Sequence, residues 1–228
     1  MLESTEDLRE ARSWAQRALG SKNAAKYFLG EENFVIAYRD SASFSFVING
    51  ESIYGQLYGP NAFFDERCQS IALADPTSES FLDLKQEGSS QFWEAITFDN
   101  GSKIELLENS NEINEIIDEH APDSSVRPGD PEEVFWGGVR NEHGKLASLA
   151  ALVKWQSGLH VMSSVVTRTQ DRGKGLATQL SAGMVSHAYL LGIPTVGLGV
   201  REGNLAAMRI YEKTGFTKLA NFTRYSRE

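Results

Sequence analysis

A polar turn with two glycines carries the residues with the clearest chemical use in this sequence. Arg172, Gly173, Lys174 and Gly175 follow the β-branched run of residues 165–167 and precede apolar residues at helical spacing. Glycine permits the close backbone approach and the unusual dihedral angles that such a turn needs. The first amides of the following helix have no intrahelical partner and carry the positive end of the helix dipole. The spacing therefore predicts a site where backbone N–H groups hold a phosphate.

Three kinds of phosphate loop can be compared with this turn. A Walker A loop requires GxxxxGK followed by Ser or Thr, and no such string occurs in the chain. A dinucleotide-binding fingerprint requires GxGxxG, but the residues after Gly175 are Leu176, Ala177 and Thr178, so the third glycine is missing. The pattern that is met is [RQ]xxGx[GA], at Arg172, Gly175 and Ala177. It is the pyrophosphate loop of the GNAT acyltransferases, which the sequence resembles here.

A second motif lies at the expected distance downstream. Residues 195–200 are typical of a strand, and Asn204, Ala207 and Tyr211 follow before a Gly-Phe pair. This order fits the superfamily's second motif, a strand, an NxxAxxxY helix and a GF turn. The resemblance covers residues 101–227 and leaves the first hundred residues outside it.

Within the superfamily, the sequence looks most like the glycine N-acyltransferase-like branch. The loop reads RGKGLAT, with Ala177 in place of glycine, Thr167 stands five residues before Arg172, and the second motif ends in YEKTGF. One departure is Thr169, where that branch usually has proline. The pyrophosphate contacts should survive this change, because amides further along the chain make them.

The resemblance implies a role for each matched residue. Tyr211 is expected to act as the general acid that protonates the departing thiolate, and the alternative is an aromatic side chain packed on the sheet. Asn204 is expected to hydrogen-bond the cofactor arm and to cap its helix. The residues expected to bind acetyl-CoA are Val165, Val166, Thr167, Arg172, Gly173, Lys174, Gly175, Leu176, Ala177, Thr178, Asn204 and Ala207.

The general base is less well defined by the sequence. Relatives often carry a glutamate or histidine on the strand before the loop, and at those positions only His160 titrates. Strand alternation places His160 on the face of Met162 and opposite Ser163, unless a bulge intervenes. Ser163 could instead hold a water that relays the proton, and a neutral amine needs no strong base. The remaining histidines are expected at the surface, without metal-ligand spacing: His120, His143 and His187.

Composition sets the broad class of the protein. With 228 residues, 41% of them hydrophobic, the chain can bury a sizeable core in one or two domains. No apolar run approaches the roughly 20 residues that span a bilayer, and the acidic start does not resemble a signal peptide. A cytoplasmic protein is expected. The single cysteine, Cys68, excludes an intrachain disulfide and favours a packed apolar role, so no metal site is expected.

The net charge of −9 conceals an uneven distribution along the chain. Residues 1–133 hold 26 acidic and 10 basic side chains, a net charge of −16, whereas residues 134–228 hold 5 and 12, a net charge of +7. A basic C-terminal half favours the capture of a coenzyme that carries several phosphates. The strongly acidic first part argues against a nucleic-acid partner.

Two domains are expected, an N-terminal α+β domain over residues 1–100 and an N-acetyltransferase domain over residues 101–228. In the first, the patterns predict a helix at residues 2–19 and a second short helix that ends at Phe28. A meander of strands follows at residues 34–38, 43–48 and 52–59, with a hairpin turn at Asn49-Gly50, and then a strand, helix and strand at residues 71–74, 77–86 and 91–97. A degenerate copy of the acyltransferase fold is the alternative left open for this domain.

The fold class expected for the second domain is α/β (α+β), with the mixed, mostly antiparallel sheet of the GNAT fold. Its predicted elements are a helix, three strands, a helix, a strand, a helix and a last strand, at residues 109–120, 133–140, 145–155, 160–167, 175–191, 195–200, 204–213 and 217–225. The polar loop of residues 121–130 is expected to border the acceptor site, and the first hundred residues are expected to close that side.

The resemblance implies an acyl-CoA-dependent N-acyltransferase that moves acetyl from acetyl-CoA to a small amine or amino acid by direct attack in a ternary complex. A strand amide near residues 165–167 would polarise the thioester carbonyl. No metal, nucleic acid or membrane is expected to take part, and a homodimer is left open. The rival hypothesis is a CoA-binding module without catalysis, which the absent carboxylate on the His160 strand favours and Tyr211 disfavours.

Overall fold

The computed structural model describes residues 1–29, 33–49, 53–59, 62–74 and 84–227. The chain divides into two compact units. The first unit contains Met1–Phe92, Val200–Gly203 and Lys218–Glu228, and the second contains Trp93–Gly199 and Asn204–Thr217. The domain boundary expected at residue 100 stays a prediction.

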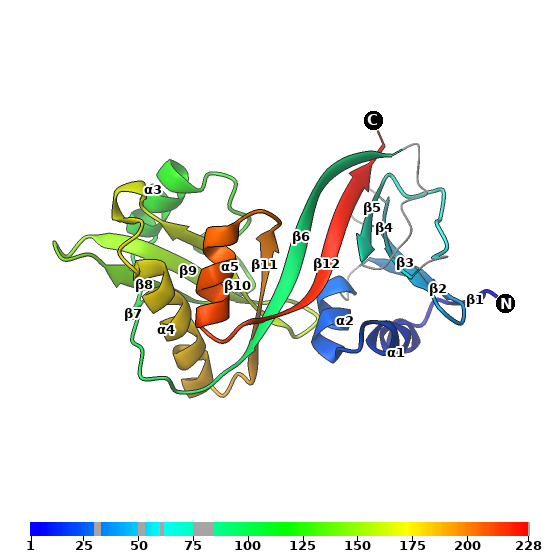
Figure 1. Cartoon of the computed structure of the whole chain (residues 1–228), viewed down its shortest axis with the longest axis horizontal. Helices are drawn as coiled ribbons and strands as arrows, with labels where there is room; N and C mark the ends of the chain where they lie inside the picture. The colour runs from blue at the N-terminus through cyan, green and yellow to red at the C-terminus, as the bar shows by residue number, and fades with distance from the viewer. Residues whose placement is uncertain (30–32, 50–52, 60–61, 75–83, 228) are drawn as a thin grey trace. The chain divides into compact units, whose positions relative to one another are not determined.

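The first unit contains two helices and a set of neighbouring, hydrogen-bonded strands. The strand order within it is β1-β2-β3-β4-β5-β12-β6, so the last strand of the chain lies beside the fifth (Figure 1). Its elements are β1 (Glu3–Thr5), α1 (Leu8–Leu19), α2 (Lys22–Phe28), β2 (Phe34–Arg39), β3 (Phe44–Asn49), β4 (Ile53–Tyr58), β5 (Ser70–Ala74), most of β6 (Lys85–Ile96) and most of β12 (Thr217–Ser226).

Helix α1 begins at Leu8, so the prediction of a helix from residue 2 was wrong at its start. The carboxylate of Asp7 accepts hydrogen bonds from the backbone N–H groups of Arg9 and Glu10, at 2.7 and 3.2 Å, which fixes the first turn. The residues before it form β1, which pairs antiparallel with β2. The helix ends at Gly20, whose φ of 66° is left-handed, as the sequence predicts.

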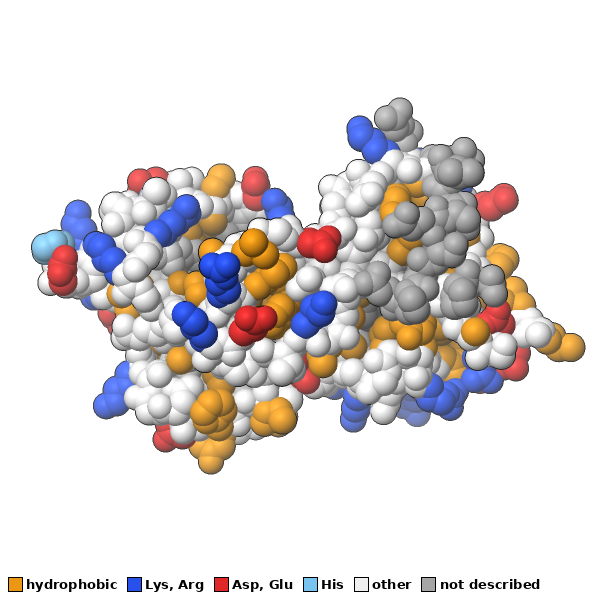
Figure 2. All heavy atoms as spheres, in the orientation of Figure 1, with side chains coloured by type: hydrophobic (Ala, Val, Ile, Leu, Met, Phe, Trp, Pro, Cys, Tyr) orange, Lys and Arg blue, Asp and Glu red, His pale blue; other side chains and the backbone are white. Residues whose placement is uncertain are grey.

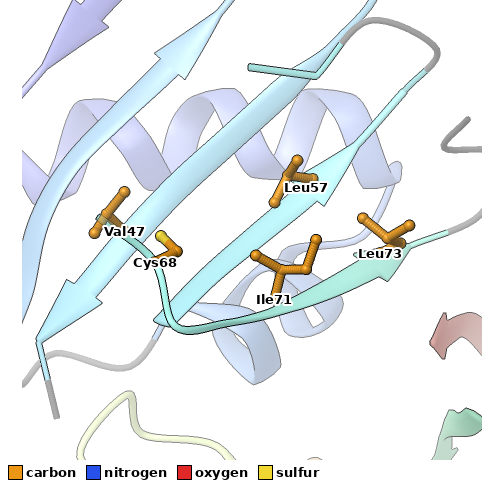
Figure 3. Packing of buried hydrophobic residues seen from close by; sticks show 5 residues of the cluster. All are labelled: Val47, Leu57, Cys68, Ile71 and Leu73. Carbon is orange, nitrogen blue, oxygen red and sulfur yellow. The ribbon is translucent and has the colours of Figure 1, made fainter. Parts of the chain in front are cut away.

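The meander predicted for this unit is present as β2, β3 and β4, which pair antiparallel in sequence order. Gly50 of the predicted hairpin turn lies outside the described residues. β3, β4, β5 and the segment just before β5 contribute the side chains of a buried cluster, Val47, Leu57, Cys68, Ile71 and Leu73 (Figure 3). Cys68 is 1% exposed in this cluster, as a small apolar side chain would be.

The helix predicted over residues 77–86 lies mostly outside the described residues, and its last part was wrong. Lys85 and Gln86 open strand β6 instead. Strand β6 lies next to β12, where the hydroxyl of Ser89 is 3.0 Å from that of Thr223. Pairing with a distant strand has overridden the local helix signal.

The second unit holds a mixed sheet that matches the predicted fold class. Strand β10 runs parallel to β11, and the order continues through β9, β8 and β7 by antiparallel pairs. The remaining elements are β7 (Glu105–Leu106), α3 (Ser110–His120), β8 (Glu133–Arg140), β9 (Leu146–Lys154), β10 (His160–Thr167), the 3₁₀ turn η1 (Thr169–Asp171), α4 (Leu176–Leu190), β11 (Thr195–Arg201) and α5 (Leu205–Lys213).

The core of the second unit is built around β9, whose sequence LASLAALV is buried at every residue. A near-continuous apolar strand is typical of a sheet covered on both faces. Helix α4 packs on this sheet through Leu180 and Met184, which are fully buried. The helix approaches closely at Gly137, where an added Cβ would lie 2.5 Å from the sulfur of Met184. The sheet and α4 therefore hold the segment between β10 and α4 in place.

Apolar side chains also gather at the exposed C-terminal end of α4 (Figure 2). Tyr189, Leu190 and Leu191 are 50%, 67% and 51% exposed there.

Among the described residues, no helix has both the length and the apolar character that crossing a membrane requires.

Candidate active site

A cavity of about 570 Å³ lies within the second unit. Its wall combines the end of β10, the loop that follows, the first turn of α4, one face of α5 and the end of α3. The predicted site residues in this wall are Val165, Val166, Thr167, Arg172, Gly173, Gly175, Leu176, Ala177, Thr178, Asn204, Ala207 and Tyr211. The predicted site residues outside it are Lys174, His160 and Ser163.

The start of α4 leaves its first amides open to the cavity. Gly173 and Gly175 have φ values of 78° and 80°, a conformation that other residues rarely adopt. Gly175 is the N-cap, and no side chain caps the helix. The N–H groups of the first turn, which begins at Leu176, point away from the helix and have no intrahelical acceptor. With the positive end of the helix dipole, they form a cradle for an anion.

Arg168 of the loop pairs with Glu115 and Glu119, and the two cations of the RGKG stretch, Arg172 and Lys174, have different surroundings. Arg172 lies in the cavity wall, where its Nε donates a 3.3 Å hydrogen bond to the backbone oxygen of Thr167. Lys174 points to Asp171 instead, with its Nζ 2.9 Å from a carboxylate oxygen. The hydrogen bond from Lys174 lowers the pKa of Asp171 from its usual value. Arg172 is therefore the loop cation that faces the cavity.

A bulge in β10 directs the end of this strand toward the cavity. The pairing with β9 shifts register between Ser163 and Val166, and Ser164 has a φ of 49°, unusual for a residue other than glycine. The hydroxyl of Ser164 donates a 3.0 Å hydrogen bond to the backbone oxygen of Val126. Val165, Val166 and Thr167 follow the bulge and line the cavity.

His160 and Ser163 lie before this bulge, where pairing with β9 is still regular. The bulge therefore does not alter the alternation that places the two side chains on opposite faces of the strand. Neither residue belongs to the cavity wall, and their roles in proton transfer stay predictions.

Tyr211 brings a buried phenol to the same cavity. It lies on α5, which Asn204 caps by accepting a 3.2 Å hydrogen bond from the backbone N–H of Ala207. Its side chain is 6% exposed, and the ring lies 5.7 Å from that of Phe216. Burial raises the pKa of Tyr211 to about 12, because the phenolate would lose its hydration. The hydroxyl thus keeps its proton at neutral pH and can serve as a proton donor.

Sequence reasoning missed His120, which was expected at the surface. Its side chain is only 6% exposed and lines the cavity, with Nδ1 3.4 Å from the hydroxyl of Thr169. The signal was available, because Ile113, Ile116 and His120 share one face of α3. His187 is partly exposed, and its ring packs edge-on against Phe135 at 4.8 Å.

His143 is exposed, as predicted. Within the part of the chain that the structure describes, no group of three or more His, Cys, Asp and Glu side chains is placed to hold a metal ion.

Comparison with known proteins relates this geometry to one family. The profile of the acetyltransferase (GNAT) family matches residues 103–216, which is half of the chain. That match includes the whole of the loop, α4 and α5. No curated protein sequence matches the chain.

Solved structures with a similar fold have low sequence identity. A GCN5-related N-acetyltransferase from Kribbella flavida is 15% identical, with a TM-score of 0.59 over 96% of this chain and 95% of that one. One from Sphaerobacter thermophilus is 16% identical, with a TM-score of 0.59 over 100% and 95%. A putative GNAT acetyltransferase from Novosphingobium aromaticivorans is 21% identical, with a TM-score of 0.50 over 70% and 74%. These likenesses support the fold.

Proposed function

Because this chain belongs to the acetyltransferase (GNAT) family, we propose that it transfers acetyl from acetyl-CoA to the amine of a small molecule or amino acid. The protein is a GNAT-family N-acetyltransferase, and acetyl-CoA is the co-substrate of that family. The proposal adds the class of acceptor and a direct attack within a ternary complex. The observation that carries it is the uncapped start of α4 in one cavity with the buried phenol of Tyr211.

The residues of the loop fit the diphosphate of acetyl-CoA. Gly173 and Gly175 keep side chains away from the amides at the start of α4, and Arg172 adds a cation to the same wall. These amides would hold the diphosphate through hydrogen bonds that charge strengthens. The bound co-substrate supplies the activated acyl group as a thioester.

The end of β10 is suited to the thioester carbonyl. Val165, Val166 and Thr167 line the cavity after the bulge. We assign to a backbone N–H in this stretch the hydrogen bond that stabilises negative charge on the carbonyl oxygen during attack. This donor needs no reorganisation, because pairing with β9 fixes the strand.

Tyr211 is assigned the role of general acid. The amine nitrogen forms a bond to the acyl carbon, the carbon–sulfur bond breaks, and the phenol gives its proton to the departing sulfur. The raised pKa of Tyr211 does not prevent this transfer, because desolvation in the same cavity also raises the basicity of a thiolate. The amine gives up one proton, and solvent restores the proton of Tyr211.

The acceptor amine must be neutral when it attacks. His160 and Ser163 stay predictions for the group that receives its proton, and an amine that arrives neutral would need neither.

The test is release of free thiol from acetyl-CoA in the presence of a panel of amines. The panel includes glycine and other amino acids, because we assign the chain to the glycine N-acyltransferase-like branch on its RGKGLAT loop. We expect amine-dependent thiol release and a product heavier by one acetyl group. CoA binding without turnover on any amine would favour the rival function, a CoA-binding module that has lost catalysis.

A further inference from the structure

We infer that Asp171 and Lys174 form a charge-neutral pair that positions the anion-binding loop, and that Arg172 alone among the loop cations acts on the bound phosphates. The inference rests on the proposed function, since it assumes that this loop holds the diphosphate of acetyl-CoA. It assigns Lys174 a positioning role in place of the direct phosphate contact that its place in the motif suggests.

The carboxylate of Asp171 is the feature that requires explanation. Asp171 is 2% exposed and lies in the cavity wall, close to amides arranged for an anion. A buried carboxylate is costly unless it is paired, and here it would also repel a phosphate. A compensating cation is therefore needed before the cavity can take an anionic ligand.

Lys174 supplies that cation from within the loop. Its Nζ lies 2.9 Å from Oδ1 of Asp171, so the pair closes the turn between residues 171 and 174. The lysine side chain is 48% exposed and does not belong to the cavity wall, whereas the aspartate side chain is 3% exposed. The ammonium group thus approaches the buried carboxylate from the solvent side.

Asn141 holds the other side of the same carboxylate. Its Nδ2 donates to Oδ1 and Oδ2 of Asp171 at 3.3 and 3.2 Å. Its Oδ1 accepts from the backbone N–H groups of His143 and Lys145, at 3.0 and 3.1 Å, which fixes the orientation of the amide. Asp171 therefore ties the loop to the turn between β8 and β9.

Arg172 differs from Lys174 in both partner and direction. Its side chain lines the cavity, and no ion pair joins it to any residue that the structure describes. The guanidinium keeps its full charge and several donors for a phosphate. One loop cation thus neutralises the protein's own carboxylate, and the other remains available for the ligand.

If Lys174 acts by neutralising Asp171, removal of the Asp171 carboxylate should restore the CoA binding that a Lys174 variant loses. A direct contact between Lys174 and the phosphates would not allow this recovery. In Lys174→Gln, the buried carboxylate loses its counter-ion and repels the phosphates. In the double variant Lys174→Gln with Asp171→Asn, that carboxylate is also removed, and the amide that replaces it can still pair with Asn141. The single change should harm binding, and the second should restore it.

The experiment is calorimetric titration of CoA into the full chain and its variants. We expect Lys174→Gln to weaken CoA binding about tenfold, because the uncompensated carboxylate repels the phosphates, and the double variant to return within about threefold of the parent. Lys174→Arg keeps a cation and should bind nearly as the parent does. Lys103→Gln, which removes an exposed charge of the same unit away from the cavity wall, is the matched control.

The outcomes separate the inference from the proposed function. A double variant as weak as Lys174→Gln would show that Lys174 acts on the phosphates directly and would overturn the inference. Equal loss in Lys103→Gln would overturn it as well, because net charge alone would then explain the effect. Failure of the parent protein to bind CoA would instead refute the proposed function. Thermal unfolding of each variant confirms that the titrated proteins are folded.

Discussion

The first backbone N–H groups of a helix have no acceptor within it, and helices α1 and α4 differ in what these groups meet. In the first unit, Asp7 accepts hydrogen bonds from two amides at the start of α1 and satisfies them within the protein. In the second unit, α4 starts at Gly175 without a side-chain cap and opens into a cavity. A cap stabilises a helix by about 1 kcal/mol, so α4 forgoes stability that α1 keeps.

The contrast extends to the other helices that the structure describes. Side chains of Ser21, Asn109 and Asn204 cap α2, α3 and α5. Within the described residues, α4 is thus the α-helix without a side-chain cap. The open start of α4 fits the anion-binding role proposed for it, because its first amides are left for a ligand.

The largest effect is expected for Gly175→Glu, which places a carboxylate at the open start of α4. We expect CoA affinity to fall by about a thousandfold or more, because the carboxylate repels phosphate and competes for the amides. Calorimetry with CoA measures the loss. Gly192→Glu is the matched control, since Gly192 has a similar φ of 73° at the exposed end of α4. Equal loss of affinity in both variants would contradict a local effect at the anion cradle.

Tyr211→Phe should separate binding from chemistry within the second unit. Loss of the phenol proton should lower turnover by about 10²-fold, with CoA affinity unchanged, since the helix start is intact. Steady-state kinetics together with calorimetry make the distinction. Tyr189→Phe, on α4 but outside the cavity wall, is the control and should keep full turnover. Unchanged turnover in Tyr211→Phe would leave the tyrosine a packing residue.

Alkaline pH should weaken both units through tyrosines whose pKa is raised, among them Tyr211 in the second unit and Tyr54 in the first. Burial raises the pKa of Tyr211 and of Tyr54 to about 12, from 10.0. Above pH 10 the unfolded chain loses a proton that the folded chain retains, so stability is complete below pH 10 and falls as the pH rises toward 12. Each group accounts for about 3 kcal/mol over this interval.

Urea unfolding at increasing pH measures this loss of stability. Tyr211→Phe and Tyr54→Phe should each flatten the decline by about 3 kcal/mol, and Tyr189→Phe, half exposed, should leave it unchanged. An alkaline decline that neither Tyr211→Phe nor Tyr54→Phe alters would show that these two hydroxyls ionise freely.

The smallest effect is expected from Asp7→Ala, which opens the start of α1. Loss of the cap should lower stability by about 1 kcal/mol and the Tm by about 2–4 °C. CoA affinity should not change, because the cavity wall contains no residue of α1. Asp7→Ser retains a capping oxygen and should restore most of the stability. A loss of CoA binding in Asp7→Ala would remove the distinction between the two helix starts.

The strand, loop and helix of the cavity could be predicted from sequence because their signals are local. Two glycines, the arginine and the apolar spacing of α4 lie within one short segment, and the structure places the segment as expected. The partner of Lys174 was not predicted, although Asp171 lies only three residues away. The motif predicts a phosphate-binding role for Lys174 from its residue type and position. Its ion pair with Asp171 becomes evident only once the burial of that carboxylate is known.

Signals that depend on distant partners were harder to interpret. The apolar side of α3 ends at His120, yet its burial depends on the sheet and η1 against which the helix packs. Lys85 and Gln86 were predicted at the end of a helix. They belong to strand β6, whose neighbour β12 is more than a hundred residues away in the sequence. Local propensity is a weak guide where a remote strand supplies the hydrogen bonds.

The return of β12 to the first unit determines the order in which the chain can fold during synthesis. Phe222–Ser226 pair with Ser70–Ala74, yet the ribosome delivers these two strands roughly 7–30 seconds apart at its usual speed. Most of the second unit, Trp93–Gly199, emerges in that interval. The first unit, whose first strands are synthesised early, is therefore completed last. One edge of β5 stays unpaired until β12 has been made. Such an edge is what chaperones must protect on a nascent chain.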